Sequence, residues 1–179
     1  MLHLYGFHRV GVAVGDLYFV DPRPGPGQEG AERGVRVEVR LLATPEHEGS
    51  IYAARPILVD QPIWRADLLE SVAGPVGSYD RTHHHPKMRG WEPGSRQFDA
   101  AMSEDPLAFL QSQLEDLDGL LAGADVDPAS VDERDAAELR AEAPGIVGTV
   151  REMLAAVRSG QLAPPPDGPE VASARVGWL

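Results

Sequence analysis

Three consecutive histidines, His83, His84 and His85, lie in the segment with the densest group of reactive side chains in the chain. If this run is extended, His83 and His85 point to the same face and stand about 7 Å apart along the strand. Both imidazoles can then converge on one metal ion. Pro86 favours this conformation, because the residue before a proline avoids the helical region.

A carboxylate would complete a site with two imidazoles. Asp80 is the first candidate, either as third ligand or as the group that orients one imidazole, while Glu92, Asp99 and His84 are further candidate ligands. Such a set suits one divalent transition metal, namely zinc, iron or manganese. Water bound to that metal becomes nucleophilic near neutral pH, as in a metal-dependent enzyme acting on a small molecule. The other interpretation is a solvated loop, or histidines hydrogen-bonded to structural carboxylates.

The same segment holds the basic patch of an otherwise acidic chain, with Arg81, Arg89 and Arg96 beside Lys87. Arg81 or Arg89 could hold the carboxylate or phosphate of a small-molecule ligand through two parallel hydrogen bonds, and Arg96 is a further candidate. Alternatively, these arginines pair with acidic helices of the second half and form an intramolecular scaffold.

The spacing of Gly77, His83 and His85, with five residues and then one residue between them, is similar to the first half of the first cupin motif. The resemblance implies two histidines and a following glutamate that hold a metal inside a small barrel of strands. Glu92 falls later than the glutamate of that family, and no second motif with Pro, Gly and His follows. We therefore transfer no cupin activity to this chain.

Charge and composition exclude several other classes of function. The net charge of −12, with the acidic excess concentrated after residue 100, argues against nucleic acids and anionic membranes as partners. The absence of cysteine excludes disulfides, thiolate metal sites, cysteine nucleophiles and iron–sulfur clusters. We find no secretion signal and no run of about 20 apolar residues, so we expect a soluble, cytoplasmic protein.

Motifs of nucleotide-binding folds and of serine hydrolases are absent from the sequence. This absence favours a non-catalytic binding, adaptor or oligomerising protein over the metal-dependent enzyme, which stays as the alternative.

Alternating apolar residues predict strands in the first half of the chain. Val35 to Leu41 is the clearest example, because four apolar side chains fall on one face and three charged ones on the other. The pattern also predicts a strand at Leu2 and Leu4, and a hairpin of Val10–Val14 and Leu17–Val20 that turns at Gly15-Asp16. Ile51–Val59 would pair with the Val35 strand, and Arg65–Val72 would form a short helix.

Leucines spaced by three and four residues predict an amphipathic helix from Pro106 to Leu121, with Asp105 as its N-cap. Residues 128–143 are helix-prone but weakly apolar, and Pro144 should kink or end this helix. Residues 146–158 predict a further helix with a strongly apolar face.

Strands followed by helices predict an α+β fold: a small antiparallel sheet of about four or five strands over residues 1–75 and two to three helices over 100–162. A connector over 76–99 would join the two parts, and a pocket would form at this junction. Residues 163–179 form a Pro-rich spacer and a terminal peptide. There Val176 and Trp178 would dock on the same domain, on a second copy or on a protein partner.

Overall fold

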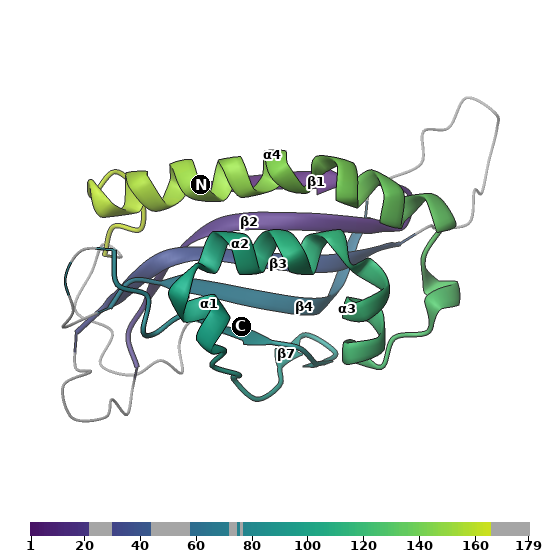
Figure 1. The fold of residues 1–179 in the computed structure, drawn as a ribbon, viewed down its shortest axis with the longest axis horizontal. Coiled ribbons are helices and arrows are strands. Elements are labelled where there is room, and N and C mark those ends of the chain that lie inside the picture. The colour runs from purple at the N-terminus through teal and green to yellow at the C-terminus, as the bar shows by residue number, and fades with distance from the viewer. Residues whose placement is uncertain (22–29, 44–57, 72–74, 76, 166–179) are drawn as a thin grey trace.

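The computed structural model describes residues 1–21, 30–43, 58–71, 75 and 77–165. Within these residues, five strands form one antiparallel sheet, and four α-helices follow it in the sequence. The expected α+β class is confirmed, with the sheet built by the N-terminal half and the helices by the C-terminal half (Figure 1).

The sheet has the order β1-β2-β3-β4-β5, so each strand pairs with its neighbour in the sequence. Its strands are β1 (Leu2–Gly6), β2 (Val10–Phe19), β3 (Glu32–Ala43), β4 (Leu58–Leu69) and β5 (His83–His85). A hairpin of β6 (Met88–Arg89) and β7 (Glu92–Pro93) follows β5. The residues from 77 to 99 therefore supply an edge strand and a hairpin as well as the link to the helices.

Two predictions in the first half of the chain are wrong. Gly15 and Asp16 do not form a turn, because both pair with β3 inside the continuous strand β2. Residues 65–69 of the predicted helix Arg65–Val72 are instead the end of β4, where they pair with β3 and where residues 65–67 also pair with β5, whereas Val72 lies outside the described residues. Pairing on both edges outweighs the local helix signal. The predicted strand Ile51–Val59 lies mostly outside the described residues, apart from Leu58 and Val59 at the start of β4.

The described helices are α1 (Ala100–Glu104), α2 (Pro106–Glu115), α3 (Leu117–Ala124) and α4 (Glu133–Arg158). The helix predicted from Pro106 to Leu121 is divided at Asp116, which ends α2 and whose side chain accepts the Gly119 N–H at the start of α3. Pro144 neither ends nor divides α4, because buried residues on both sides of it pack in the core. None of the helices described is both long and apolar enough to cross a membrane.

The helices lie along one face of the sheet (Figure 1). Alternating residues of β2, β3 and β4 point toward them and are almost completely buried. The core includes Val10, Val12, Val14, Val35, Val37, Val39, Trp64, Ala66 and Leu68 from the sheet and Leu110, Leu114, Leu121, Leu139, Ile146 and Val150 from the helices. This packing makes the sheet a rigid support for the side chains on its other face.

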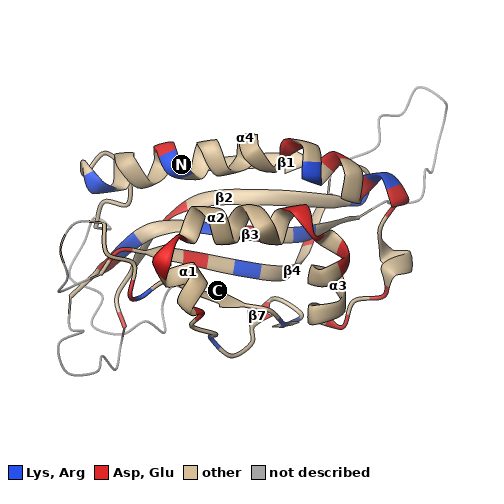
Figure 2. Ribbon diagram, in the orientation of Figure 1, with Lys and Arg blue, Asp and Glu red and all other residues tan. Residues whose placement is uncertain are grey.

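Charged residues are spaced along β3 and β4 (Figure 2). Because the alternate apolar residues of both strands point toward the helices, the charged side chains between them lie on the opposite face of the sheet. Glu38 accepts a hydrogen bond from Arg65 Nε at 2.9 Å and forms an ion pair with Arg40. The Arg40 guanidinium carbon lies 5.0 Å from the centre of the Trp91 ring, in the loop between β6 and β7. The β6–β7 hairpin therefore lies over this charged face.

The chain after α4 returns to the sheet, where the buried Ala163 donates its N–H to Asp16 Oδ2 at 2.7 Å. The expected docking of Val176 and Trp178 concerns residues outside those that the structure describes.

Asp135, in the first turn of α4, is fully buried and connects the helix to the loop between β1 and β2. Its carboxylate accepts the backbone N–H groups of His8, Arg9 and Asp132 at 2.8–3.2 Å. A buried carboxylate needs several such partners to offset its lost hydration.

We expect Asp135→Ala to lower the free energy of unfolding by about 2 kcal/mol or more, because three backbone donors lose a charged, buried acceptor. Glu133→Ala is the matched control, since Glu133 is exposed in the same turn of α4 and should change that free energy by less than about 0.5 kcal/mol. Urea unfolding monitored by circular dichroism measures both. Equal effects of the two substitutions would contradict the role of Asp135.

Gly34 is required by a close approach of two backbones. A Cβ at this position would lie 1.9 Å from the carbonyl oxygen of Leu68, whereas a Cβ at Gly148 in α4 would meet nothing within 4 Å. Gly34→Ala should therefore destabilise the protein by about 1–3 kcal/mol, and Gly148→Ala should stabilise it by about 0.5–1 kcal/mol. Opposite shifts in the urea midpoint are expected, and a shift in the same direction would contradict this account.

Candidate metal centre

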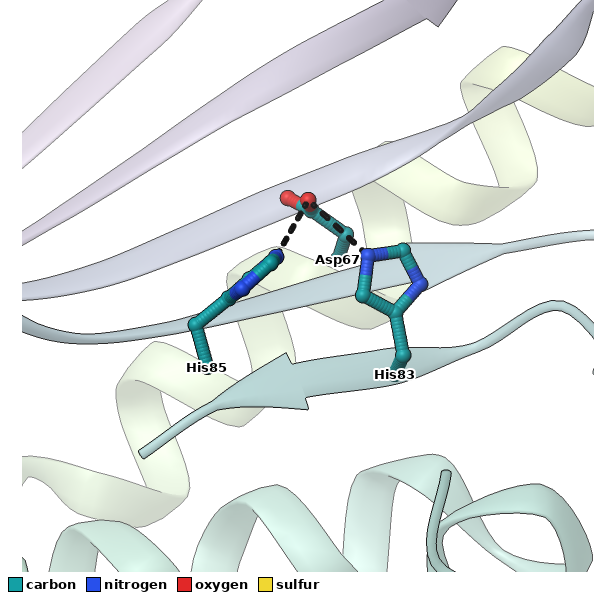
Figure 3. Close-up of side chains that lie close together, drawn as sticks. All are labelled: Asp67, His83 and His85. Atoms are coloured by element: carbon teal, nitrogen blue, oxygen red, sulfur yellow. Dashed lines mark ion pairs between the residues drawn. The ribbon is translucent and has the colours of Figure 1, made fainter. Parts of the chain in front are cut away.

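Three buried side chains converge on the face of the sheet away from the helices: Asp67 of β4, and His83 and His85 of β5 (Figure 3). The register of the two strands explains this, because Asp67 pairs directly with His83, and His85 lies two residues further on the same face. One ligand atom from each residue lies within 4.8 Å of the other two. The expected shared face of His83 and His85 is therefore present.

The atoms that face one another are all potential acceptors. His83 Nε2 lies 3.6 Å from Asp67 Oδ2, and His85 Nε2 lies 3.9 Å from the same oxygen. Both distances exceed that of a hydrogen bond. The two imidazole rings stand edge to face with their centres 5.1 Å apart. The gap between the three groups is of the size that a metal ion bridges.

The second nitrogen of each imidazole is bonded to the backbone. His83 Nδ1 lies 2.9 Å from the Arg81 carbonyl oxygen, and His85 Nδ1 lies 2.9 Å from the Gly94 carbonyl oxygen. Because a carbonyl only accepts, each Nδ1 must carry the hydrogen and donate it. In the neutral imidazole each Nε2 then carries no hydrogen, and its lone pair is directed toward Asp67. A histidine that binds a metal through Nε2 has this same tautomer.

Arg36 of β3 holds the carboxylate in place from the other side. Its Nε donates to Asp67 Oδ1 at 2.7 Å, and its Nη2 donates to Oδ2 at 3.2 Å. Burial alone would raise the pKa of Asp67, but the charge and hydrogen bonds of Arg36 outweigh it and leave that pKa below its usual value. Asp67 is therefore ionised, with its shorter hydrogen bond on the oxygen that does not face the histidines.

Burial lowers the pKa of His83 to about 4, although the Arg81 carbonyl and the charge of Asp67 act in the opposite direction. Burial also lowers the pKa of His85, against the Gly94 carbonyl and Asp67. At neutral pH both imidazoles are therefore uncharged. The cluster then presents one carboxylate oxygen and two nitrogen lone pairs to a common centre.

A pocket of about 180 Å³ adjoins these three residues. Besides the cluster, it is lined by the charged side chains Arg36, Arg65 and Arg96, by the apolar residues Leu17, Phe19, Leu69 and Pro93, and by Gly94. A small molecule in the pocket would thus lie against the potential ligand atoms. The pocket forms where β5, the end of β7 and the residues that follow it meet β2, β3 and β4, and no residue of the described helices lines it.

The other candidate ligands lie elsewhere. His84 points into the core, where its ring centre is 5.3 Å from that of Phe109 and 6.0 Å from that of Trp64. Asp80 is exposed in the turn before β5, and Glu92 is exposed on β7. Asp99 is the N-cap of α1 and accepts the Ala101 N–H. The structure therefore brings Asp67, and not one of these residues, to His83 and His85.

The three candidate anion-binding arginines also separate. Arg81 pairs with the buried Glu32 of β3, and Arg89 is exposed on β6. Arg96 lines the pocket, and its Nη1 lies 4.0 Å from Asp21 Oδ2. The partners of Arg81 and Arg96 thus belong to the first half of the chain. For these two arginines, the expected pairing with acidic helices of the second half is wrong.

Sequence reasoning missed Asp67 because it assigned that residue to a helix. A usable signal was present: Arg65 and Asp67 are alternate charged residues, flanked by the apolar Trp64, Ala66 and Leu68. Read with a period of two, this pattern places both charges on one face of a strand. Arg36 of β3 lies on the same face of the sheet as these two residues and pairs with Asp67.

Comparisons with protein-family models, curated proteins and solved structures give no match for this chain. Any conclusion about function depends on the geometry of Asp67, His83 and His85 and of the pocket beside them.

Proposed function

We propose that this chain binds one divalent transition-metal ion through Asp67 Oδ2, His83 Nε2 and His85 Nε2 and uses it on a small molecule in the adjoining pocket. The observation that carries the proposal is the approach of these three acceptor atoms to within 4.8 Å, while each Nδ1 donates to a carbonyl. Three lone pairs that face one another repel unless a cation lies between them.

A proton is the weaker candidate for that cation. The buried environment of His83 and His85 disfavours the imidazolium form and lowers the pKa of both residues. In addition, the distances of 3.6 and 3.9 Å to Asp67 are too long for the short hydrogen bond that an imidazolium forms with a carboxylate. A metal ion at the centre of the cluster satisfies all three atoms at once.

Two imidazoles and one carboxylate suit zinc, iron or manganese. Three protein ligands leave coordination positions open, which is typical of catalytic centres, whereas structural zinc sites are closed by four protein ligands. When bound, such an ion polarises a substrate oxygen or lowers the pKa of a bound water. Arg36 orients the Asp67 carboxylate from outside, and the Arg81 and Gly94 carbonyls orient the two imidazoles.

The adaptor interpretation is based on the absence of nucleotide-binding and serine-hydrolase motifs and on Val176 and Trp178, which lie outside the described residues. The contacts of Asp67, His83 and His85 instead support a metal-dependent protein that acts on a small molecule.

Chelator-treated protein incubated separately with zinc, iron(II) or manganese and then desalted should retain about one equivalent of at least one of them per chain. His83→Asn with His85→Asn should abolish this retention, and Asp67→Asn should reduce it strongly, because each removes a ligand atom. Elemental analysis measures the metal, and circular dichroism confirms that the variants fold.

Asp80→Asn and His84→Gln are the matched controls for this experiment. Asp80 is exposed in the turn before β5, and His84 lies between the two ligands but points into the core. Both variants should retain the metal as the wild type does. Absence of metal from the wild type, or equal retention by the double histidine variant, would refute the proposed centre.

The metal-free protein should lose stability as the pH falls, because the unfolded chain binds a proton at His83 more tightly than the folded chain does. The ordinary pKa of a histidine is 6.5, and the pKa of His83 in the folded protein is about 4. The loss of stability therefore begins near the ordinary pKa and continues down to the pKa of the folded protein. The slope from this residue is at most about 1.4 kcal/mol per pH unit.

Urea unfolding in chelator at several values from about pH 7 to about pH 5 measures this dependence. His83→Asn should lose less stability than the wild type over that range, since Asn does not titrate. Parallel curves for the two proteins would contradict the depressed pKa of His83.

A further inference from the structure

We propose that the pocket beside the metal centre takes a small molecule with an oxyanion group and an apolar portion, and that Arg96 binds the oxyanion. The oxyanion is a carboxylate or a phosphate, which share the geometry that a guanidinium recognises with two parallel hydrogen bonds. This inference rests on the proposed metal-binding function and names the substrate class of the same site.

The charge of the pocket lining is the first observation that supports an anionic ligand. Its charged lining consists of three arginines, Arg36, Arg65 and Arg96, against the single carboxylate of Asp67. The lining residues therefore carry more positive than negative charge before any metal is bound, although Glu38 and Asp21 behind the lining pair with Arg65 and Arg96. A divalent ion adds further positive charge at the wall formed by His83 and His85. Such a pocket attracts anions and disfavours cationic ligands.

The three arginines differ in how they are engaged. Arg36 donates to both oxygens of Asp67, and the side chain of Arg65, only 5% exposed, donates to Glu38 at 2.9 Å. The side chain of Arg96 is 40% exposed, and its ion pair with Asp21 spans 4.0 Å. A guanidinium has five N–H donors, so Arg96 can turn at least two of them toward a ligand. Arg96 is therefore the anion-binding residue of this pocket.

Phe19 supports Arg96 in this position. The guanidinium carbon of Arg96 lies 5.6 Å from the centre of the Phe19 ring, within the range of a cation–π contact. Both residues line the pocket, so the aromatic ring holds the guanidinium beside the space that a ligand would fill.

The apolar lining and the size of the pocket define the rest of the ligand. Leu17, Phe19, Leu69 and Pro93 present hydrocarbon surface, which rewards an apolar group. The pocket measures about 180 Å³, the share of about six water molecules in the liquid. Benzoate and phenyl phosphate are suitable probes, since each joins one oxyanion to one compact apolar ring.

The test uses the full chain loaded with manganese(II), whose effect on the relaxation of water protons reports both metal binding and ligand access to the metal. Benzoate and phenyl phosphate are titrated separately, and benzyl alcohol serves as the neutral probe of similar shape. We expect at least one of the anions to bind, and to bind about tenfold or more tightly than benzyl alcohol. The preferred anion identifies the carboxylate or the phosphate as the recognised group.

Arg96→Gln should weaken binding of that anion by about tenfold or more while manganese affinity stays unchanged, because Arg96 is not a metal ligand. Arg96→Lys should restore part of the affinity, since it keeps the charge and loses the two-pronged geometry. Arg89→Gln is the control, because Arg89 is exposed on β6 and does not line the pocket. It should leave anion binding as in the wild type.

The outcomes separate this inference from the proposed function. If manganese binds normally but neither anion binds, or Arg96→Gln binds the anion as tightly as the wild type, or benzyl alcohol binds as well as the anions, the substrate class is overturned and the metal centre stands. If the wild type retains none of zinc, iron(II) and manganese in the preceding metal experiment, both are overturned. If it retains zinc or iron(II) but not manganese, the same probes are titrated by calorimetry into protein loaded with the retained metal, and the same outcomes apply.

Discussion

The buried carboxylate of Asp67 is the group around which the charged face of the sheet is organised. An ionised carboxylate is costly to remove from water, so it must be surrounded by donors or cations. Arg36 donates one hydrogen bond to each carboxylate oxygen, whereas His83 Nε2 and His85 Nε2 lie 3.6 and 3.9 Å from Oδ2, beyond hydrogen-bond distance. The metal ion that we propose would lie on the side of the carboxylate that faces the two histidines and would add to the compensation by Arg36.

In β4 and β5, side chains that pack in the core alternate with side chains that face the candidate site. In β4, Trp64, Ala66 and Leu68 pack in the core while Arg65 and Asp67 face the pocket side. In β5, the ring of His84 packs in the core and its backbone bonds to that of Gln97, while its two neighbours form the cluster. The middle histidine therefore anchors a strand of three residues, which its own pairing alone would hold weakly.

The sequence predicted the class of the fold and the shared face of His83 and His85, because both follow from a period of two in an extended chain. It did not predict the third member of the cluster. Asp67 joins the histidines through the pairing of β4 with β5, and such pairing between distant segments is not encoded in any local pattern. The helix expected at Arg65–Val72 and the turn expected at Gly15-Asp16 failed for the same reason, since hydrogen bonding to neighbouring strands overrides local preference. The sequence indicated Arg96 as a candidate by its residue type. Only the ion pair of Arg81 with Glu32 and the exposed position of Arg89 distinguish Arg96 as the arginine that lines the pocket.

The position of Arg36 also has a chemical consequence for an ion in the cluster. Arg36 offsets much of the charge of Asp67, and both imidazoles are neutral, so the protein ligands neutralise little of the charge of a divalent cation. Such an ion would be bound less tightly than in a site with several carboxylates, but it would remain more electrophilic. Its residual positive charge would act on the same side of the pocket as the arginines and would favour a ligand that brings its own negative charge. The low charge of the protein ligands and the preference for a small anion that we propose would therefore both depend on the hydrogen bonds of Arg36 to Asp67.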